Sequence, residues 1–138
     1  MGLLFYMLGM VLNKRKLLAD RELLGRWGEK YCLGFLKRKG LKTLTRNFSC
    51  KTGEIDLIMV DTDRTIVFIE VKTRADETFN SVESSITATK KARLVRTAHY
   101  FLATHKIDNR PFRFDVVTIV LGQKGSPQIR HYQNAFVP

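Results

Sequence analysis

The chain has 138 residues, of which 44% are apolar and 27% are charged, so one domain with a hydrophobic core is expected. This balance excludes a disordered chain. Lysine and arginine number 24 against 13 acidic residues, which gives a net charge of +11. Such an excess of positive charge on a small domain indicates a polyanionic partner, and nucleic acid is favoured over a membrane surface.

The first dozen residues are almost wholly apolar, and a basic run at 13–16 follows them. This segment is too short to cross a bilayer, which takes about 20 residues, and a secretory signal would carry its positive charge before the apolar run. We therefore expect no membrane anchor. Residues 1–19 are interpreted as an arm that packs on the domain or on a partner chain, or as chain upstream of the domain. Residues 20–138 are predicted to form a single domain.

The cysteines and histidines show no metal-ligand spacing. Cys32 and Cys50 both lie in apolar surroundings, which predicts two buried free thiols in a reducing, cytoplasmic compartment. His99 and His105 have no acidic or thiol partner at ligand spacing, so we interpret both as structural.

Helical periodicity predicts a first helix over residues 20–39, ended by Gly40. The apolar residues that set this period, and that we expect to be buried, are Leu23, Leu24, Trp27, Tyr31 and Phe35. Glu29 lies outside this stripe, on a flank of small and apolar residues. It either pairs with Arg21 or Arg26 on the surface or faces the strands as an additional acidic group.

Three strands are predicted after this helix. Residues 41–49 are a weak strand candidate, and a turn at 51–53 leads into the next strand. Two runs rich in Ile and Val, at 53–60 and 65–72, are separated by four polar residues, and this pattern is typical of a hairpin.

Charged residues interrupt both strands of the hairpin. Asp56 lies inside the first run, and Glu70 and Lys72 lie near the end of the second, on the same side of that strand. A carboxylate in so apolar a strand costs several kcal/mol unless a cation compensates it. Two acids and a lysine together would hold a divalent metal such as Mg²⁺ and a water molecule. Such a group would polarise a phosphoryl oxygen and activate the water, which is the chemistry of a phosphodiesterase.

The competing interpretation is an ordinary cross-strand ion pair on a solvated face. The two interpretations differ in the register of the hairpin. Asp56 and Glu70 face the same side only if the loop between the strands has an odd number of residues or contains a bulge, because a one-residue slip reverses every side chain.

A second helix is predicted from Ser85 or Thr87, since both are good N-caps. Its apolar period consists of Leu94, Val95, Ala98, Phe101 and Leu102. Its other side carries Lys90, Lys91, Arg93 and Arg96. The helix dipole disfavours cations in the first turns, so this side either contacts phosphate or is simply a solvated basic face.

The remaining chain predicts a buried strand at 110–120 and an edge strand at 128–136. The element order is therefore αβββαββ. This order predicts an α/β fold in which helices flank a mixed sheet, with a parallel pair across the second helix.

Two stretches of the hairpin, GEIDLI at 53–58 and FIEVKTR at 68–74, together resemble the PD-(D/E)xK nuclease signature. Over about residues 24–136 the chain resembles the YraN family of small bacterial proteins. Supporting matches are GRWGE at 25–29, RNF at 46–48 and RFDVV at 113–117. The resemblance implies a restriction-endonuclease-like fold, similar also to archaeal Holliday-junction resolvases.

Carried over by position, the resemblance implies that Asp56 and Glu70 bind a metal together with the backbone carbonyl of Val71. Lys72 would be the catalytic lysine and Glu29 an additional helical acid. The implied cofactor is Mg²⁺, which Mn²⁺ can replace. The residues expected to contact nucleic acid are Arg74, Lys90, Lys91 and Arg93.

Three functions follow from these observations. The leading one is a metal-dependent nuclease that hydrolyses DNA, on branched or otherwise structured substrates. The second is a nucleic-acid-binding protein that has the nuclease fold and little or no catalytic activity, although such a protein would have little reason to keep three buried charges. The third is a basic interaction protein in which the N-terminal arm makes a homodimer, and a homodimer would also suit a nuclease for symmetric junctions.

Overall fold

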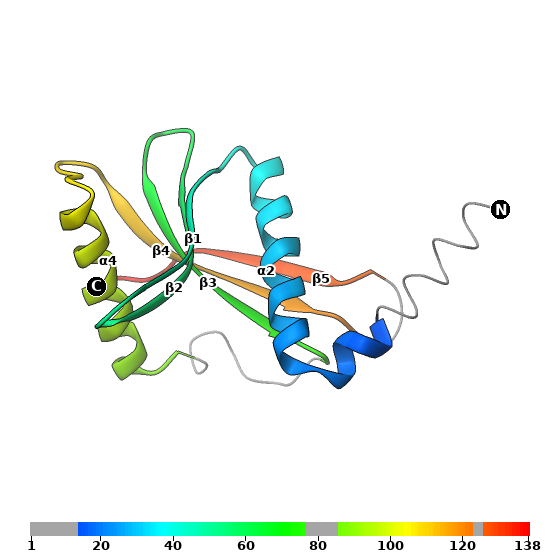
Figure 1. Ribbon diagram of the computed structural model, residues 1–138. Coiled ribbons are helices and arrows are strands. Elements are labelled where there is room, and N and C mark those ends of the chain that lie inside the picture. The colour runs from blue at the N-terminus through cyan, green and yellow to red at the C-terminus, as the bar shows by residue number, and fades with distance from the viewer. Residues whose placement is uncertain (1–13, 77–85, 123–125) are drawn as a thin grey trace.

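The computed structural model describes residues 14–76, 86–122 and 126–138. Within them, two long helices lie on opposite faces of a five-stranded sheet (Figure 1). Most of the predicted N-terminal arm lies outside the described residues. Its last part, 14–19, is helical, and Leu17 is buried in a small apolar cluster. No described helix is long and apolar enough to cross a membrane.

Helix α2 (Arg21–Arg38) begins and ends close to the predicted positions. Asp20 is the N-cap, and its side chain accepts hydrogen bonds from the first turn of the helix. At the other end, Gly40 adopts φ +100°. The Gly40 N–H donates to the Lys37 carbonyl at 3.0 Å and the Leu41 N–H donates to the Leu36 carbonyl at 3.1 Å. This Schellman arrangement confirms Gly40 as the stop signal.

The buried face of α2 differs from the predicted stripe. It consists of Leu24, Gly28, Cys32, Leu33 and Leu36. The predicted Leu23, Trp27, Tyr31 and Phe35 are only partly buried and lie at its margin. The reason is Gly28, where an added Cβ would lie 1.9 Å from Thr73 Oγ1 on strand β3 (Ile66–Arg74). Apolar periodicity does not register a glycine, yet this glycine is where the helix approaches the sheet most closely.

The strands follow the order β1-β2-β3-β4-β5 across the sheet. The remaining strand bounds are β1 Lys42–Cys50, β2 Gly53–Val60, β4 Phe112–Val120 and β5 Gln128–Phe136. Strands β3 and β4 are parallel and the other neighbours antiparallel. Helix α4 (Ala88–Thr104) connects the parallel pair, with Thr87 as its N-cap. The mixed α/β fold and the αβββαββ order are thus confirmed, whereas Ser85, the alternative cap, lies outside the described residues.

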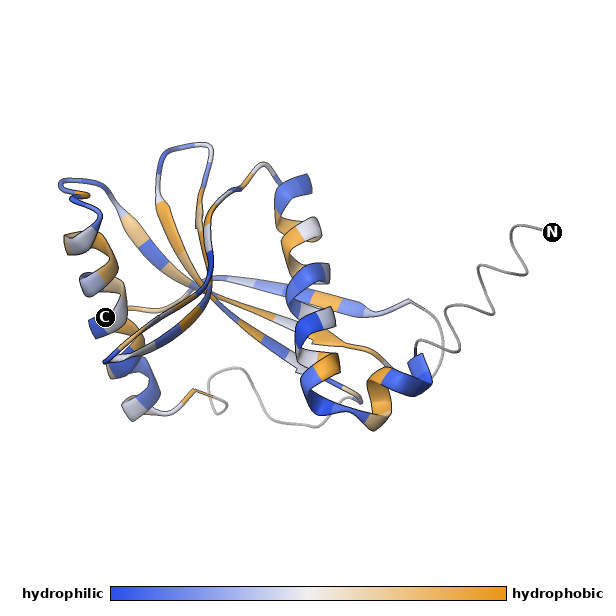
Figure 2. Ribbon diagram, viewed as in Figure 1, coloured by the Kyte–Doolittle hydropathy of each residue, from blue (hydrophilic) through white to orange (hydrophobic). Residues whose placement is uncertain are grey.

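Each face of the sheet has its own core. Phe68 and Phe114 pack with Leu94 and Phe101 of α4 on one face. On the other face, the residues that pack together are Cys32, Leu33, Leu36, Leu41, Leu57, Met59, Val67, Ile69, Val117 and Ile119. Apolar and hydrophilic residues accordingly alternate along both helices (Figure 2).

The hairpin of β2 and β3 has the register that the metal-site interpretation requires. Leu57 pairs with Ile69 and Val60 pairs with Ile66, so the loop at 61–65 contains five residues. The predicted turn of four residues was one residue too short. Thr65 belongs to the loop, because its carbonyl accepts a hydrogen bond from the Asp61 N–H at 2.9 Å.

Asp115 forms a buried polar hub between β4 and β5 that no pattern in the sequence indicated. It is 1% exposed and accepts hydrogen bonds from Arg113 Nε at 3.0 Å, His131 Nε2 at 2.7 Å and the Asn134 N–H at 2.9 Å. Arg113 also pairs with Asp61 at 3.0 Å. These contacts attach the edge strand to the centre of the sheet and satisfy a carboxylate that would otherwise be costly to bury.

Candidate functional site

Asp56 lies where strands β2 and β3 separate. The last backbone pair of their ladder is Leu57 with Ile69. One residue further, Asp56 Oδ2 accepts a hydrogen bond from the Val71 N–H at 2.8 Å. The side chain of Asp56 therefore takes the place of a backbone acceptor and is held against the peptide that joins Glu70 to Val71.

A local irregularity in the neighbouring strands directs Asp56 to this position. Ile55 packs in the core on the α4 side, whereas Leu57 packs on the α2 side, so the alternation of β2 breaks at the aspartate between them. On β1, the register places Asn47 opposite Asp56, and Asn47 has φ +52°. Asparagine tolerates this left-handed conformation better than most residues, which allows a break in the middle of a strand.

Glu70, Lys72 and Lys90 converge next to Asp56. Lys72 Nζ lies 3.8 Å from Glu70 Oε1, and Lys90 Nζ lies 2.6 Å from the same oxygen. The side chains of Glu70 and Lys72 are only 11% and 15% exposed, so this is not the solvated ion pair of the competing interpretation. Lys90 comes from the first turn of α4, which brings the second helix to the acidic residues of the hairpin.

Burial and neighbouring charges shift the pKa values of these groups. Desolvation, with a smaller contribution from Glu70, raises the pKa of Asp56 to about 7. Desolvation and the adjacent Lys90 lower the pKa of Lys72 to about 8. Burial would also lower the pKa of Lys90, but its ion pair with Glu70 outweighs this and raises it. The cluster thus contains an acid and a lysine that both titrate near neutral pH.

Glu29 faces this cluster rather than the solvated pairs considered from the sequence. Burial raises its pKa, a hydrogen bond from the Asn47 side chain opposes the shift, and Glu70 is close enough to add to it. Arg26 pairs instead with Glu22, at 3.6 Å. Glu29 lines a cleft of about 740 Å³ together with Arg21, Val71, Lys72 and Arg74 among others.

The predicted nucleic-acid contacts are distributed over several places. Arg74 is exposed and lines the same cleft as Lys72, although its guanidinium also donates to the Thr73 carbonyl at 3.1 Å. The ammonium group of Lys91 lies 5.7 Å from the centre of the Phe136 ring. Arg93 lies beside a separate pocket at the turn between β1 and β2. Lys90 is therefore the predicted contact that lies directly on the acidic cluster.

The donor atoms fit a hard divalent cation. Among the described residues, no three acidic, histidine or cysteine side chains lie close enough to form a complete metal site. Asp56 and Glu70 offer two carboxylates, and the Val71 backbone carbonyl is the third donor that the family resemblance implies. Mg²⁺ accepts such an incomplete set of oxygen ligands, because it keeps several waters and binds substrate phosphate directly. Burial and, to a smaller extent, Glu70 raise the pKa of Asp56, and a cation bound beside this carboxyl group would oppose both effects.

Comparison with known proteins gives one consistent family. The model of "Uncharacterised protein family UPF0102" matches residues 28–119. A UPF0102 protein of Pelotomaculum thermopropionicum is 38% identical over 86% of this chain and 100% of its own length. One from Caldicellulosiruptor saccharolyticus is 41% identical over 91% of this chain and 100% of its own length. One from Pseudomonas aeruginosa LESB58 is 41% identical over 81% of this chain and 90% of its own length. The resemblance to the YraN family is confirmed by these matches, because YraN is this family.

Proposed function

The chain belongs to the UPF0102 family, and from the geometry of its site we propose that it is a metal-dependent nuclease acting on DNA. The substrate we infer is branched or otherwise structured DNA, as the resemblance to junction resolvases implies. The observation that carries the proposal is the convergence of Asp56, Glu70 and Lys72 at the point where two central strands separate.

This convergence is difficult to explain as a purely structural feature. Two carboxyl groups lie close enough for one to raise the pKa of the other, and the neighbour of Glu70 on β4 is the fully buried Val116. A structural role would be served better by an apolar pair, since buried charges rarely stabilise a fold. A divalent cation would relieve the repulsion and explain why the arrangement is kept.

In the proposed reaction, a bound Mg²⁺ ion would polarise a phosphoryl oxygen and lower the pKa of a water ligand. Asp56, Glu70 and the Val71 carbonyl would hold that ion. Lys72, whose pKa of about 8 leaves part of the population neutral near pH 7.5, accepts the proton of the attacking water. The water oxygen bonds to phosphorus while one ester P–O bond breaks, and the leaving oxygen takes a proton from solvent. Arg74 and Lys90 are the nearest cations for the phosphate oxygens of the substrate.

A second function is favoured by the ion pair between Lys90 and Glu70. An ammonium group 2.6 Å from Glu70 Oε1 competes with a metal ion for that oxygen. If this pair persists when nucleic acid binds, the protein is a binding module with the nuclease fold and no catalytic activity. In the nuclease, Lys90 instead leaves Glu70 and moves to a phosphate oxygen.

Cleavage and binding measured on the same variants distinguish the two functions. We expect Glu70→Gln and Asp56→Ala to abolish Mg²⁺- or Mn²⁺-dependent cleavage while DNA affinity stays within a few-fold of the parent. Glu22→Gln is the matched control, because Glu22 is an exposed acid on α2 that pairs only with Arg26 among the described residues. Cleavage by Glu70→Gln at the parental rate would remove the proposed site from consideration. Binding without cleavage by the parent protein would establish the binding module.

A further inference from the structure

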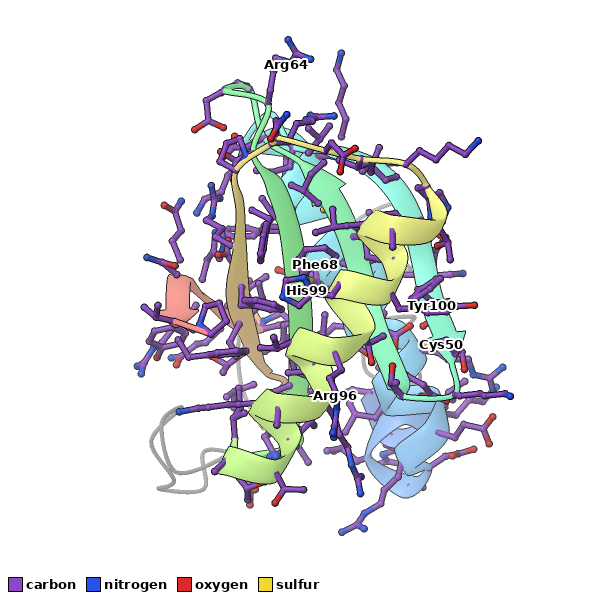
Figure 3. The ribbon with its side chains drawn as sticks, turned by 90° about the vertical axis from the view of Figure 1, so that its left-hand side faces the viewer. Cys50, Arg64, Phe68, Arg96, His99 and Tyr100 are labelled. Atoms are coloured by element: carbon purple, nitrogen blue, oxygen red, sulfur yellow. The ribbon has the colours of Figure 1, made fainter. Side chains whose placement is uncertain are left out.

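A second basic pocket lies at the turn between β1 and β2, outside the cleft described above. It has a volume of about 520 Å³ and lies between this turn and one face of α4. Its lining residues are Ser49, Cys50, Lys51, Thr52, Gly53, Glu54, Arg93 and Arg96. In Figure 3, Arg96 of α4 and Cys50 at the end of β1 lie toward the same end of the sheet, opposite Arg64 in the hairpin loop.

The pocket carries an excess of positive charge that the described protein does not neutralise. Lys51, Arg93 and Arg96 are exposed, and none of them takes part in the ion pairs formed among the described residues. Glu54 is the only acidic side chain in the lining. Three cations against one acid leave a positive surface that favours an anion.

A chain of hydrogen bonds fixes the shape of this pocket. Thr97, which is fully buried in α4, donates from Oγ1 to the Arg93 carbonyl at 2.8 Å. Thr52 Oγ1 lies 2.9 Å from Thr97 Oγ1 and 3.1 Å from Cys50 Sγ. Thr97 gives its proton to the carbonyl, so Thr52 donates to Thr97 while Cys50 is a neutral thiol, and the Thr52 hydroxyl can donate to Cys50 Sγ once the thiol ionises. The β1–β2 turn is thereby attached to the helix that supplies the two arginines.

The pocket is also close to the acidic cluster. Gly53 in the pocket and Asp56 in the cluster are three residues apart on β2, which corresponds to about 10 Å along an extended strand. On α4, Arg93 lies one turn, or about 5 Å, from Lys90. A single nucleic-acid strand therefore needs only a few nucleotides to reach from one site to the other.

We propose that this pocket is a binding subsite for a backbone phosphate of the nucleic-acid strand that the Asp56–Glu70 cluster binds, at a position a few nucleotides from the phosphate at that cluster. Lys51, Arg93 and Arg96 supply the cations of the subsite. The proposal deepens the proposed function and rests on it for the identity of the anion. It assigns a role to Lys51 and Arg96, which lie outside the acidic cluster and its cleft.

The two cysteines provide a direct test. Cys50 lines the pocket, is partly exposed, and has a pKa lowered chiefly by its hydrogen bond with Thr52. Cys32 is fully buried, and burial raises its pKa to about 12. Alkylation of the native protein therefore reports on Cys50. Mass spectrometry measures the rate at which Cys50 reacts with the anionic reagent iodoacetate and with the neutral reagent iodoacetamide. The iodoacetate rate divided by the iodoacetamide rate, normalised to the same ratio for N-acetylcysteine, reports the local electrostatic potential.

We expect the normalised ratio of the iodoacetate rate to the iodoacetamide rate to be at least about three at low salt. It should fall to about one in Arg93→Gln/Arg96→Gln. The control is Arg38→Gln, which removes an exposed arginine from α2 and should leave the ratio unchanged. The iodoacetamide rate serves as the folding check, because an unfolded variant would also expose Cys32. A ratio that is the same in the parent and the double variant would overturn the proposal.

Nucleic acid is then added to the same reaction. A saturating single-stranded oligonucleotide, with binding followed by fluorescence anisotropy, should slow alkylation of Cys50 by both reagents in the parent protein. If the oligonucleotide binds and Cys50 reacts at its unprotected rate, the phosphate subsite is wrong while the proposed nuclease is unaffected. If Cys50 is protected but no metal-dependent cleavage occurs, the phosphate subsite is supported and the proposed nuclease activity is contradicted. If no oligonucleotide or duplex binds at all, both are overturned.

Discussion

Asp56 is held where its charge destabilises the folded protein. Its pKa is raised from the usual 3.8 to about 7, chiefly by burial. Between these two pH values the folded state keeps a proton that the unfolded chain has released. The free energy of unfolding of the metal-free protein therefore decreases as the pH rises through this window, by up to about 1.4 kcal/mol per pH unit from this group.

The variant Asp56→Asn should be more stable than the parent at pH 8 and of similar stability at pH 4. Asparagine retains an acceptor for the Val71 N–H but has no proton to lose. Mg²⁺ should raise the melting temperature of the parent, because it binds only the folded state, and should leave the variant unchanged. Thermal melts at pH 4, 6 and 8, with Mg²⁺ or EDTA, measure both effects.

The control for that experiment is Asp108→Asn, since Asp108 is exposed and outside the cluster. This variant should follow the parent at every pH and respond to Mg²⁺ as the parent does. A parent protein that gains stability relative to Asp56→Asn between pH 4 and pH 8 in EDTA would show that Asp56 is not buried as described.

Lys72 is the residue whose protonation state governs the proposed reaction. A proton acceptor must be neutral, and the pKa of Lys72 is lowered to about 8 by burial and by Lys90. The single-turnover cleavage rate should therefore rise with pH, reach half its maximum near pH 8 and level off above it. Lys72→Arg keeps the charge but stays protonated, so we expect at least about a 100-fold slower reaction and a flat profile, with DNA affinity retained. An arginine variant with the parental profile would exclude this role.

At the scale of elements, the contact between α2 and β3 positions Glu29 over the cleft. It depends on Gly28, which leaves no room for a methyl group beside Thr73. Gly28→Ala should lower the free energy of unfolding by about 1–3 kcal/mol, because overpacking outweighs the gain in helix propensity. Gly34→Ala on the same helix meets nothing within 4 Å and should instead stabilise by about 0.5–1 kcal/mol. Urea denaturation of both variants measures the difference.

A second substitution distinguishes steric conflict from other effects of Gly28→Ala. Thr73→Ala removes the two atoms that the new methyl group would meet first, Oγ1 and Cγ2. The double variant should recover part of the stability lost in Gly28→Ala, giving a coupling free energy of about 0.5–2 kcal/mol in a double-mutant cycle. Additive effects of the two substitutions would mean that the helix does not approach β3 at this point.

The elements could be predicted from the sequence because their signals are local, whereas the four polar residues at 61–64 alone indicated the wrong hairpin register. Asp20, Gly40 and Thr87 mark helix ends by their own chemistry. The requirement that Asp56 and Glu70 share a face reduces to the length of one loop, and the five-residue loop satisfies it. Local patterns of this kind are readable in a single sequence.

The features that could not be predicted depend on residues far apart in the chain. Cys50 was expected to be buried, but it ends β1 beside a pocket whose other wall is α4. The hub at Asp115 requires His131 from the edge strand, and the ion pair of Glu70 requires Lys90 from α4. Such long-range pairs leave no periodicity in the sequence, so a resemblance or a structure is needed to find them.

At the scale of the whole molecule, the net charge of +11 predicts binding to DNA that depends strongly on salt. A plot of log K against log salt concentration should have a slope of several units. Glu70→Gln should leave this slope nearly unchanged, because it removes no cation. Arg93→Gln/Arg96→Gln should reduce the slope by about 0.7–0.9 for each phosphate that the variant no longer neutralises. Equal slopes in the parent and the double variant would show that these arginines do not bind phosphate.

The association state is a separate prediction for the whole molecule. A homodimer would suit a nuclease for symmetric junctions, because two sites related by a two-fold axis can act on two strands. Analytical ultracentrifugation of the protein with and without a four-way DNA junction measures its association state. A protein that stays monomeric on a saturated junction would rule out the dimer, while leaving the site itself intact.

The most direct test of the central claim is a cleavage panel of single-stranded, duplex, flap and four-way-junction DNA with Mg²⁺ or Mn²⁺. Glu70→Gln protein purified in parallel is the control for contaminating nucleases. We predict that at least one structured DNA is cut by the parent protein, and that EDTA and the Glu70→Gln substitution each abolish the cut. Absence of any metal-dependent cleavage by the folded parent protein, or equal cleavage by the variant, would contradict the claim that Asp56, Glu70 and Lys72 form a nuclease site.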